Sequence, residues 1–476
     1  MHKRKVRAVI LGAGPAGLTA AYELLQQSEV QPLVVEKNPF VGGLCLTARA
    51  GDNLADIGGH RFFTKFSKVH DWWLQFLPLD APNTTDTFIT QNRLSRIYYL
   101  RRFFDYPVAL NLRTFHGLGL KRMLNIIASY LRAKLHPIKP EKSAEDFLIN
   151  TFGKVLYRTF FKDYTEKLWG ISCREISAEW GRERIRGIHL REIVLSVLKA
   201  FRPKIKDTFL YPKYGPAQLW QKVADKVLKQ GGEFTFNAEV VRLNTSGDKI
   251  ISAVIRMADG SEQTIEGDYF ISSLPVKDLI TMLPNVPQNI RQIAAGLQYR
   301  NFRSAVVLLN KMLKTHILPD TWLYIQESDV KIGRIQVYNN WSADLLADRT
   351  KVLLALEYFC GDNDNLWQMS DEKFTAMAIA EAEKISLIDD KDVIEAYSFK
   401  LEKAYPAYFG SYSQFEQIKN YTDSVKNLYL IGRNGMHKYI NMDHAVLSGM
   451  AVAENIAHNL QDKENIWNID NSKYLD

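Results

Sequence analysis

Cysteine and long apolar runs are scarce in this chain of 476 residues. Only Cys45, Cys173 and Cys360 occur, far apart and without a Cys-x-x-Cys pair. The sequence therefore predicts neither a disulfide framework nor a bound metal, and it fits a reducing cytoplasm. No stretch approaches the ~18–20 consecutive apolar residues of a transmembrane helix, so no span is expected. The basic start, residues 1–5, leads into a strand pattern rather than a cleavable apolar segment, so no signal peptide is expected.

Composition indicates a folded protein with more than one domain. Hydrophobic residues make up 46% and charged residues 24%, which is typical of a soluble globular chain. The length exceeds that of one ordinary domain, so two domains interleaved along the chain are expected. A formal net charge of +8 serves solubility, or it attracts an anionic substrate or a membrane surface. No nucleic-acid-binding motif accompanies the charge.

The N-terminal segment carries the pattern of a dinucleotide-binding βαβ unit. The apolar run Ala8–Leu11 predicts a buried parallel strand, followed by Gly12, Gly14 and Gly17. These glycines suit a tight turn, a close approach to a pyrophosphate and helix–strand packing, in that order. A helix over residues 16–27 and a strand over residues 32–35 follow, and Glu36 lies 19 residues past Gly17. An acid there suits a free ribose. This unit alone fits NAD and FAD equally.

The order of elements predicts an α/β fold in which a Rossmann-like nucleotide domain alternates with an inserted substrate domain of helices and antiparallel sheet. Residues 66–205 have mainly helical patterns, strand patterns return at 206–275 and 300–360, and an acidic helix is expected over 371–384. The chain ends with a strand over 428–431 and a helix beginning near Asp443. The expected segments are 1–65, 206–275 and 411–476 for the cofactor, and 66–205 and 276–410 for the substrate.

The segment Leu120–Leu135 has two interpretations. Its apolar residues recur at helical spacing, and it also carries Lys121, Arg122, Arg132 and Lys134. Packing on the core with a solvated basic edge is the simpler interpretation. A helix lying on a membrane surface is the other.

Two short motifs after the βαβ unit resemble a known group. Gly42-Gly43-Leu44 and Asp56-Ile57-Gly58-Gly59-His60 resemble the large flavoprotein group that contains amine oxidases, protoporphyrinogen oxidases and UDP-galactopyranose mutases. The resemblance implies FAD as the cofactor, with the double glycine passing its pyrophosphate. It also implies that the loop bearing His60 crosses the isoalloxazine. Without the resemblance, His60 is equally well a loop histidine held by a backbone hydrogen bond.

Stretches in the rest of the chain resemble the mutases in particular. They are Phe161–Trp169, Glu183-Arg184-Ile185, Trp322-Leu323-Tyr324, Gly333-Arg334-Ile335 with Asn340-Trp341, and Gly432-Arg433-Asn434-Gly435 with Lys438–Asp443. The resemblance implies that Tyr164 and Trp169 border the nucleobase. Two residues depart from the mutase pattern, since Thr165 replaces an asparagine of the eukaryotic proteins and His444 a glutamine of the bacterial ones. Both departures concern which base and sugar are bound.

The resemblance implies a complete set of site residues. Catalytic roles fall to Arg334, Arg433 and His60. Substrate contacts fall to Tyr164, Trp169, Arg184, Tyr324, Asn340 and Tyr439. Cofactor contacts fall to Gly12, Gly14, Gly17, Glu36, Gly43, Leu44, His60, Val240, Gly432, Met442 and Asp443. Taken from the residues alone, each arginine is most simply a surface residue and the two aromatics core residues. Arg433 stands apart because it directly follows an apolar strand and a glycine.

Two enzyme functions follow from the resemblance. In the first, the protein interconverts the pyranose and furanose forms of a UDP-sugar of the galactose type, and N5 of reduced FAD forms a bond to the anomeric carbon while UDP leaves. NADH or NADPH is the expected reductant. In the second, it is an FAD-dependent oxidoreductase acting on an amine, a porphyrinogen or a polyene. Cations at positions 334 and 433 favour the first, because opposed arginines suit a diphosphate. A non-catalytic FAD-binding scaffold would give these residues no role.

Overall fold

The computed structural model describes residues 5–106, 114, 117–184 and 208–469, and it has the expected α/β architecture. A parallel five-stranded sheet has the order β19-β13-β1-β2-β9. Its strands come from three separate parts of the chain: β1 (Arg7–Leu11), β2 (Gln31–Val35), β9 (Glu233–Thr235), β13 (Tyr269–Ser272) and β19 (Leu428–Leu430). β1 is buried along four of its five residues, as expected for a parallel strand covered on both faces.

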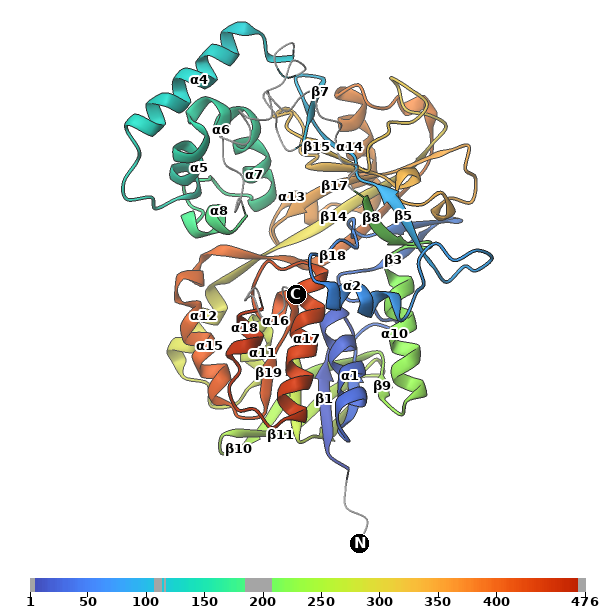
Figure 1. Cartoon of the computed structure of the whole chain (residues 1–476), viewed down its shortest axis with the longest axis vertical. Coiled ribbons are helices and arrows are strands. Elements are labelled where there is room, and N and C mark those ends of the chain that lie inside the picture. The colour runs from blue at the N-terminus through green and yellow to red at the C-terminus, as the bar shows by residue number, and fades with distance from the viewer. Residues whose placement is uncertain (1–4, 107–113, 115–116, 185–207, 470–476) are drawn as a thin grey trace.

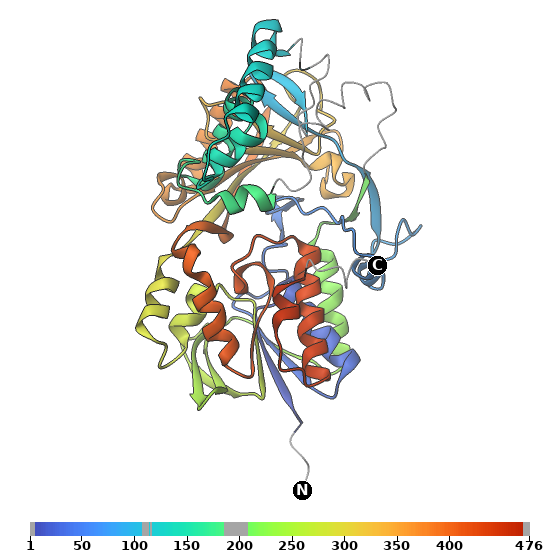
Figure 2. The same ribbon diagram turned by 60° about the vertical axis from the view of Figure 1, so that its left-hand side comes forward.

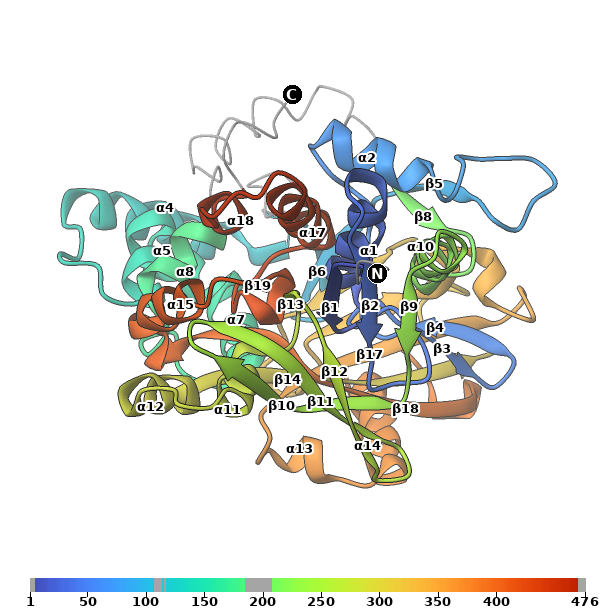
Figure 3. The ribbon, with the colours of Figure 1, turned by 90° about the horizontal axis from the view of Figure 1, so that it is seen from below.

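Helices cover one face of this sheet and a small antiparallel sheet covers the other (Figure 3). The helices are α1 (Pro15–Gln27), α10 (Ala217–Lys229) and α17 (Met442–Ala457). The antiparallel sheet consists of β10 (Ala238–Ser246), β11 (Lys249–Met257) and β12 (Glu262–Glu266). Proline at the first position of α1 is pre-set for a helix start. The packing of α17 along α1 is close, since a Cβ on Gly449 would lie 2.6 Å from the Ala16 carbonyl oxygen.

The core of this nucleotide domain extends beyond the expected segment boundary at residue 275. α11 (Val276–Met282) and α12 (Gln288–Gly296) contribute Val276, Leu279, Ile290 and Ile293 to it. α15 (Phe415–Ser424) and α18 (Glu464–Trp467) complete this part. The chain leaves for the second sheet only at Leu297.

A second, seven-stranded sheet lies above the first in Figure 1. Its order is β18-β14-β17-β16-β15-β6-β7. The strands are β6 (Ser95–Tyr99), β7 (Arg102–Asp105), β14 (Leu297–Leu309), β15 (Trp322–Ile325), β16 (Arg334–Val337), β17 (Val352–Cys360) and β18 (Val393–Gly410). α14 (Asp371–Lys384) has the expected bounds, with the Ser370 hydroxyl accepting from the Lys373 N–H at its start. β17 is buried throughout, so this sheet has its own core.

A helical unit flanks the second sheet, on the left in Figure 1 and edge-on in Figure 2. It contains α4 (Leu120–Leu135), α5 (Ala144–Phe152), α6 (Lys154–Phe160), α7 (Lys162–Trp169) and α8 (Ala178–Arg184). The helical pattern expected after α8, up to residue 200, lies outside the described residues. Residues 66–205 are less helical than expected, because β6 and β7 add to the second sheet and β5 (Phe88–Asn92) pairs with β8 (Thr208–Pro212).

The remaining elements are short. They are β3 (Thr47–Ala50), β4 (Asn53–Asp56), α2 (Ser67–Leu74), α13 (Asn365–Gln368), α16 (Gly432–Gly435), η1 (Tyr338–Asn340), η2 (Ala343–Leu345), η3 (Asp390–Asp392) and η4 (Ser411–Gln414). Within the described ranges, no helix has the length and apolar character that crossing a membrane requires.

A buried carboxyl, Asp56 at the end of β4, joins β3, β8 and η1 through hydrogen bonds. It accepts a hydrogen bond from the Tyr211 hydroxyl and one of 3.0 Å from Thr47 Oγ1, and its backbone oxygen accepts from the Tyr338 hydroxyl at 2.6 Å. Burial raises the pKa of Asp56 to about 7, outweighing the two side-chain hydrogen bonds. The native state therefore holds a proton that the unfolded chain releases near pH 4.

We predict that Asp56 makes the free energy of unfolding decrease as pH rises. Its contribution is complete below about pH 4 and is lost as pH passes about 7, amounting to at most about 4 kcal/mol. Urea unfolding of the wild type and Asp56→Asn across this range measures it. The difference between the two proteins isolates Asp56, because His60 and His437, whose pKa values burial lowers, act with the opposite sign in both. A difference independent of pH would contradict the assignment.

Candidate functional site

The first glycine loop is packed so tightly that only glycine fits at two of its positions. Gly12 has φ +107°, and a Cβ there would lie 2.4 Å from Ser273 Oγ. A Cβ on Gly17 would lie 2.1 Å from the Gly12 carbonyl oxygen. The loop thus closes tightly between β1 and α1, and the N–H groups that begin α1 face the carboxyl edge of the sheet. Such a helix start suits a phosphate.

The double glycine expected to pass the cofactor touches this first loop. Gly42 N–H donates to the Ala13 carbonyl oxygen at 2.9 Å. A Cβ on Gly43 would lie 2.8 Å from Gly14 Cα, and Gly43 has φ +55°. The two backbones therefore meet without a side chain between them. Leu44 follows in the same turn and is half-buried.

Glu36 lies at the end of β2, and its carboxylate orders the same loop. Oε2 accepts from the Ala13 N–H at 2.9 Å, and Oε1 accepts from the backbone and side-chain nitrogens of Asn38 at 3.0 and 2.8 Å. A carboxylate has about four acceptor sites, so one remains for a ribose hydroxyl. Val240 is buried in β10 at a register shift of the antiparallel sheet.

The C-terminal segment brings a second helix start to this edge. Gly432 has φ +70°, and a Cβ there would lie 3.0 Å from the Ala16 Cβ. Met442 and Asp443 begin α17, and the Met442 sulfur lies 3.9 Å from Cys45 Sγ. Asp443 Oδ1 accepts from both the backbone N–H and the Nδ1 of His444, each at 2.9 Å. The starts of α1 and α17 thus flank one place on the sheet edge.

His60 lies on the loop between the two sheets. Its Nδ1 is buried and has no hydrogen-bond partner among the described residues. Burial lowers the pKa of His60 to about 3, and the positive charges of Arg433 and Arg334 lower it further. The ring is neutral at physiological pH and holds an unused polar atom between two guanidinium groups. Such an orphaned atom fits a polar ligand.

Arg334 is buried and already paired. Its Nε lies 2.5 Å from Glu357 Oε2, and its Nη2 donates to the Tyr405 hydroxyl at 3.1 Å. The guanidinium carbon lies 4.7 Å from the Trp322 ring centre. Glu357 therefore neutralises most of the charge that the sequence assigned to a diphosphate, and Arg334 mainly orients Tyr405.

Arg433, unlike Arg334, is held by neutral groups. Its Nε and Nη1 donate to the backbone oxygens of Ile440 and Ala404, at 3.0 and 3.1 Å. No carboxylate pairs with it in the part of the chain that the structure describes. Its guanidinium carbon lies 4.9 Å from the ring centre of Tyr439, which stacks on Tyr405 at 5.6 Å. Tyr405, on β18, thus connects Arg334 and Arg433.

A further cation, Arg61, was not among the residues expected from the sequence. It follows His60, and its guanidinium carbon lies 5.0 to 5.4 Å from the ring centres of Phe209, Trp322 and Trp341. Nη2 donates to the hydroxyl oxygens of Ser95 and Thr321, and Nε has no partner. Burial lowers the pKa of Arg61 to about 10, and Arg93 and Arg334 lower it further. No acid compensates it among the described side chains.

The structure rearranges the expected aromatic pair. Trp169 is 1% exposed and makes edge contacts with Trp180, Tyr408 and Phe409, so it belongs to the core. Tyr164 instead meets the Tyr324 ring edge-on at 5.5 Å. Tyr324 in turn stacks on a residue that the sequence did not single out, Tyr106, with ring centres 4.3 Å apart.

Two other expected substrate residues have different outcomes. The Asn340 Nδ2 donates to the carbonyl oxygens of Leu318 and Asp320, both at 2.7 Å, so this amide supports the backbone. Arg184 is the last described residue of α8, and its side chain lies outside the described part.

Tyr405 and Tyr106 were missed because neither lies in a glycine-bearing motif. Tyr405 belongs to the long strand β18, which has no clear alternation in the sequence. The signal that could have found Arg61 was its place directly after His60.

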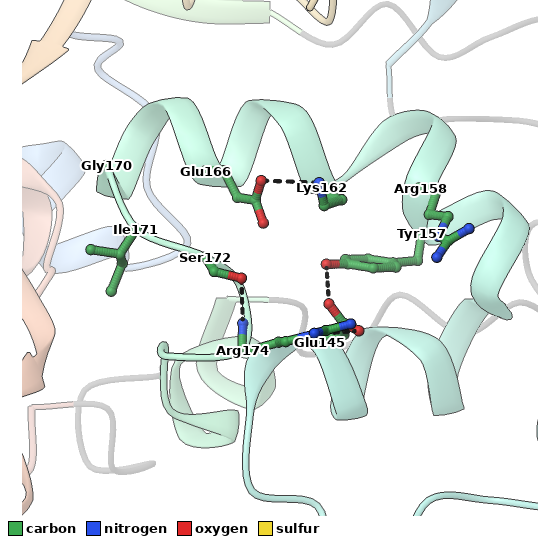
Figure 4. Close-up of a pocket in the computed structure, with 9 residues that line it drawn as sticks. All are labelled: Glu145, Tyr157, Arg158, Lys162, Glu166, Gly170, Ile171, Ser172 and Arg174. Carbon is green, nitrogen blue, oxygen red and sulfur yellow. Dashed lines mark hydrogen bonds and ion pairs between the residues drawn. The ribbon is translucent and has the colours of Figure 1, made fainter.

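A cavity of about 600 Å³ lies elsewhere, between α5, α6 and α7 (Figure 4). Most of its charged groups pair with each other: Lys162 with Glu166 at 3.2 Å, and Arg174 with Glu145 at 3.3 Å. None of the expected site residues lines it. The candidate site is therefore the junction of the two sheets, where the glycine loops meet Arg61, Arg334 and Arg433.

Comparison with known proteins identifies the family of this chain. Residues 15–457 match the model of the flavin containing amine oxidoreductases. The chain belongs to this family. It is therefore a flavoprotein, and FAD-binding relatives support FAD as the flavin. One of them is an FAD-binding monooxygenase of Emericella nidulans, 32% identical over 147 residues that cover 31% of this chain and 22% of the relative.

Two similar proteins are mutases. A dTDP-fucopyranose mutase of Escherichia coli is 28% identical over 177 residues, covering 36% of this chain and 44% of the relative. A crystal structure of reduced UDP-galactopyranose mutase superposes with a TM-score of 0.80 at 20% identity, covering 98% of this chain and 97% of that one. At that identity the superposition concerns the fold. The chain spans less than half the length of these two curated relatives, the monooxygenase and the dTDP-fucopyranose mutase.

We predict that the contact between the two glycine loops is required for FAD binding. In Gly43→Ala the new methyl group meets Gly14 Cα, so the apoprotein should bind FAD at least about 10-fold more weakly, a loss of roughly 1.4 kcal/mol. Fluorescence titration of the apoprotein with FAD measures this.

The matched control is Gly247→Ala. Gly247 has φ +60°, close to that of Gly43, but a Cβ there meets nothing within 4 Å. Both substitutions carry the cost of left-handed backbone, about 1 kcal/mol, and only one has the clash. Equal FAD affinity of the two variants would refute the role of the contact.

Proposed function

We propose that this protein is a flavin-dependent sugar-nucleotide mutase that interconverts the pyranose and furanose forms of a UDP-sugar of the galactose type. The observation that carries the proposal is the surplus of half-buried positive charge at the junction. Arg61 and Arg433 have no carboxylate partner among the described residues, whereas Glu357 pairs with Arg334. Desolvated cations are costly unless a counter-charge is present. An anionic substrate supplies that charge.

A diphosphate fits this surplus in the sign of its charge and in the donors that it requires. It carries two phosphates, and guanidinium groups bind phosphate oxygens through paired hydrogen bonds. Tyr439 and Tyr324 lie beside the cations and have hydroxyl groups that can donate to the same oxygens. The stacked pair Tyr106 and Tyr324 offers a flat surface for a nucleobase.

The chain's residues and the cofactor have separate tasks. Reduced FAD, held by the glycine loops and Glu36, would supply the nucleophile for the anomeric carbon. As the bond from that carbon to the diphosphate breaks, negative charge grows on the leaving oxygen, and Arg61 and Arg433 stabilise it there. Neutral His60 adds no further positive charge beside them, and its Nδ1 is available for a hydrogen bond to the cofactor or the sugar. The reaction is redox-neutral once the flavin is reduced, and NADH or NADPH is the proposed reductant.

An oxidoreductase acting on an amine is the second candidate, because the family carries that description. A protonated amine would be repelled by Arg61 and Arg433, which makes this function less favourable on charge. The location we propose is the cytoplasm, where sugar nucleotides and reduced nicotinamides occur together.

We predict turnover of a UDP-sugar only when the flavin is reduced. The dithionite-reduced protein, incubated with UDP-galactose and in parallel with dTDP-fucose, should give the furanose isomer of at least one, detected by chromatography. The oxidised protein is the control and should give none. The proposal fails if neither sugar nucleotide is converted, or if an amine reduces the flavin stoichiometrically while UDP does not bind.

We also predict that the two unpaired arginines bind the diphosphate. Arg61→Gln and Arg433→Gln should each weaken UDP binding about 10- to 100-fold, since a hydrogen bond to a charged group contributes about 1.5–3 kcal/mol. Quenching of flavin fluorescence by UDP measures the affinity.

Arg256→Gln is the matched control, because Arg256 is an exposed arginine of β11 that pairs with Glu262 at 3.0 Å. Its UDP affinity should equal that of the wild type. Unchanged UDP affinity in both Arg61→Gln and Arg433→Gln would show that the diphosphate does not bind at this site.

A further inference from the structure

Helix α4 has two apolar faces, and only one of them is used by the fold. Met123, Ile126 and Ala133 are buried, in the core shared with α5 and α6. The other face carries an apolar row of five residues that are 48% to 76% exposed: Leu120, Leu124, Ile127, Leu131 and Leu135. Figure 1 shows α4 along the outer edge of the helical unit. No described residue covers the row.

The row is continuous rather than scattered. At 100° per residue its five members fall within an arc of about 80°, and over 16 residues the helix is about 24 Å long. Single exposed leucines are ordinary on a protein surface, but a contiguous apolar strip of this kind marks an interaction surface.

Positive charge borders the row on both sides. Lys134 lies next to one edge, and Lys121 and Arg132 lie next to the other, all of them exposed. No aspartate or glutamate occurs from residue 106 to residue 140. An apolar strip between cations, with no acid nearby, has the chemistry of a helix that lies in the interface of an anionic bilayer.

A basic cavity lies at the C-terminal end of α4, where Lys134, but none of the five residues of the row, lines it. It has a volume of about 580 Å³, and Ile138, Lys134, Lys139 and Arg182 are among the residues that line it. Glu141 is the single acid there, and it pairs with Arg182 at 3.3 Å. The cavity therefore offers cations for a phosphate headgroup beside the apolar row.

We propose that α4 docks this protein on the surface of a membrane containing anionic phospholipids. The apolar row faces the acyl chains, and Lys121, Arg132 and Lys134 meet the lipid phosphates. A second copy of this chain is a poorer occupant, because pairing two α4 helices would bring two sets of these cations together. The docking does not depend on the mutase activity proposed above.

The test is cosedimentation of the FAD-loaded full chain with vesicles. The wild type should sediment with vesicles of phosphatidylcholine mixed with phosphatidylglycerol. It should stay in the supernatant when the vesicles contain phosphatidylcholine alone. The triple variant Lys121→Gln, Arg132→Gln, Lys134→Gln should partition on the order of 100-fold less, as expected from the attraction of each cation to an anionic surface. The double variant Leu124→Gln, Leu131→Gln should lose at least about 10-fold, because both side chains leave the acyl region.

Leu228→Gln is the matched control, since Leu228 is 49% exposed on α10, away from α4. It should bind like the wild type, and the flavin spectrum of every variant reports an intact fold. Absence of wild-type binding, equal binding to both vesicle types, or unchanged binding of the α4 variants would each overturn the proposal. The proposal would also be overturned if the wild type is a dimer and the Leu124→Gln, Leu131→Gln variant is a monomer. The row would then contact a second copy of the chain.

Discussion

The close contact between Gly14 and Gly43 is the constraint from which the rest of the site follows. It holds two loops, from separate turns of the chain, backbone against backbone at the carboxyl edge of the parallel sheet. The chain can then run through β3 and β4 to Asp56 and onward to His60 and Arg61. Any side chain at Gly43 would push the second loop away, and with it the residues that cross to the second sheet.

Charge at the junction is organised by pairing some cations and leaving others free. The Glu357 carboxylate neutralises the charge of Arg334. Arg334 in turn donates a hydrogen bond to Tyr405, on which Tyr439 stacks. Arg433 and Arg61 are held by backbone oxygens, hydroxyl groups and aromatic faces, none of which cancels a positive charge. Burial, together with the positive charges of Arg433 and Arg334, lowers the pKa of His60 and keeps the ring neutral. The junction is thus preorganised for an anion, because its cations are already partly desolvated and are held in place by hydrogen bonds.

Much of the fold was accessible from sequence patterns because its strands are continuous and its glycines have distinct tasks. The parallel strands and α14 lie where the apolar runs and the acidic helical pattern place them. The strands β6 and β7 were hidden, since the strand that joins this hairpin to the seven-stranded sheet, β15, is more than 200 residues away along the chain. The exposed face of α4 was also ambiguous, because a helix with apolar residues on two sides shows the same spacing whichever side is buried.

The sequence by itself determined the class of cofactor site, through Gly12, Gly14, Gly17 and Glu36, because a phosphate-binding turn is local and its residues are adjacent in the chain. Only the tertiary structure decided which cations remain unpaired. Arg334 and Arg433 look alike as residues, and Arg61 has no motif of its own. Their difference arises from Glu357, which the fold brings to Arg334 and not to Arg61 or Arg433. Charge compensation is a property of distance in space, and for that reason it could not be read along the chain.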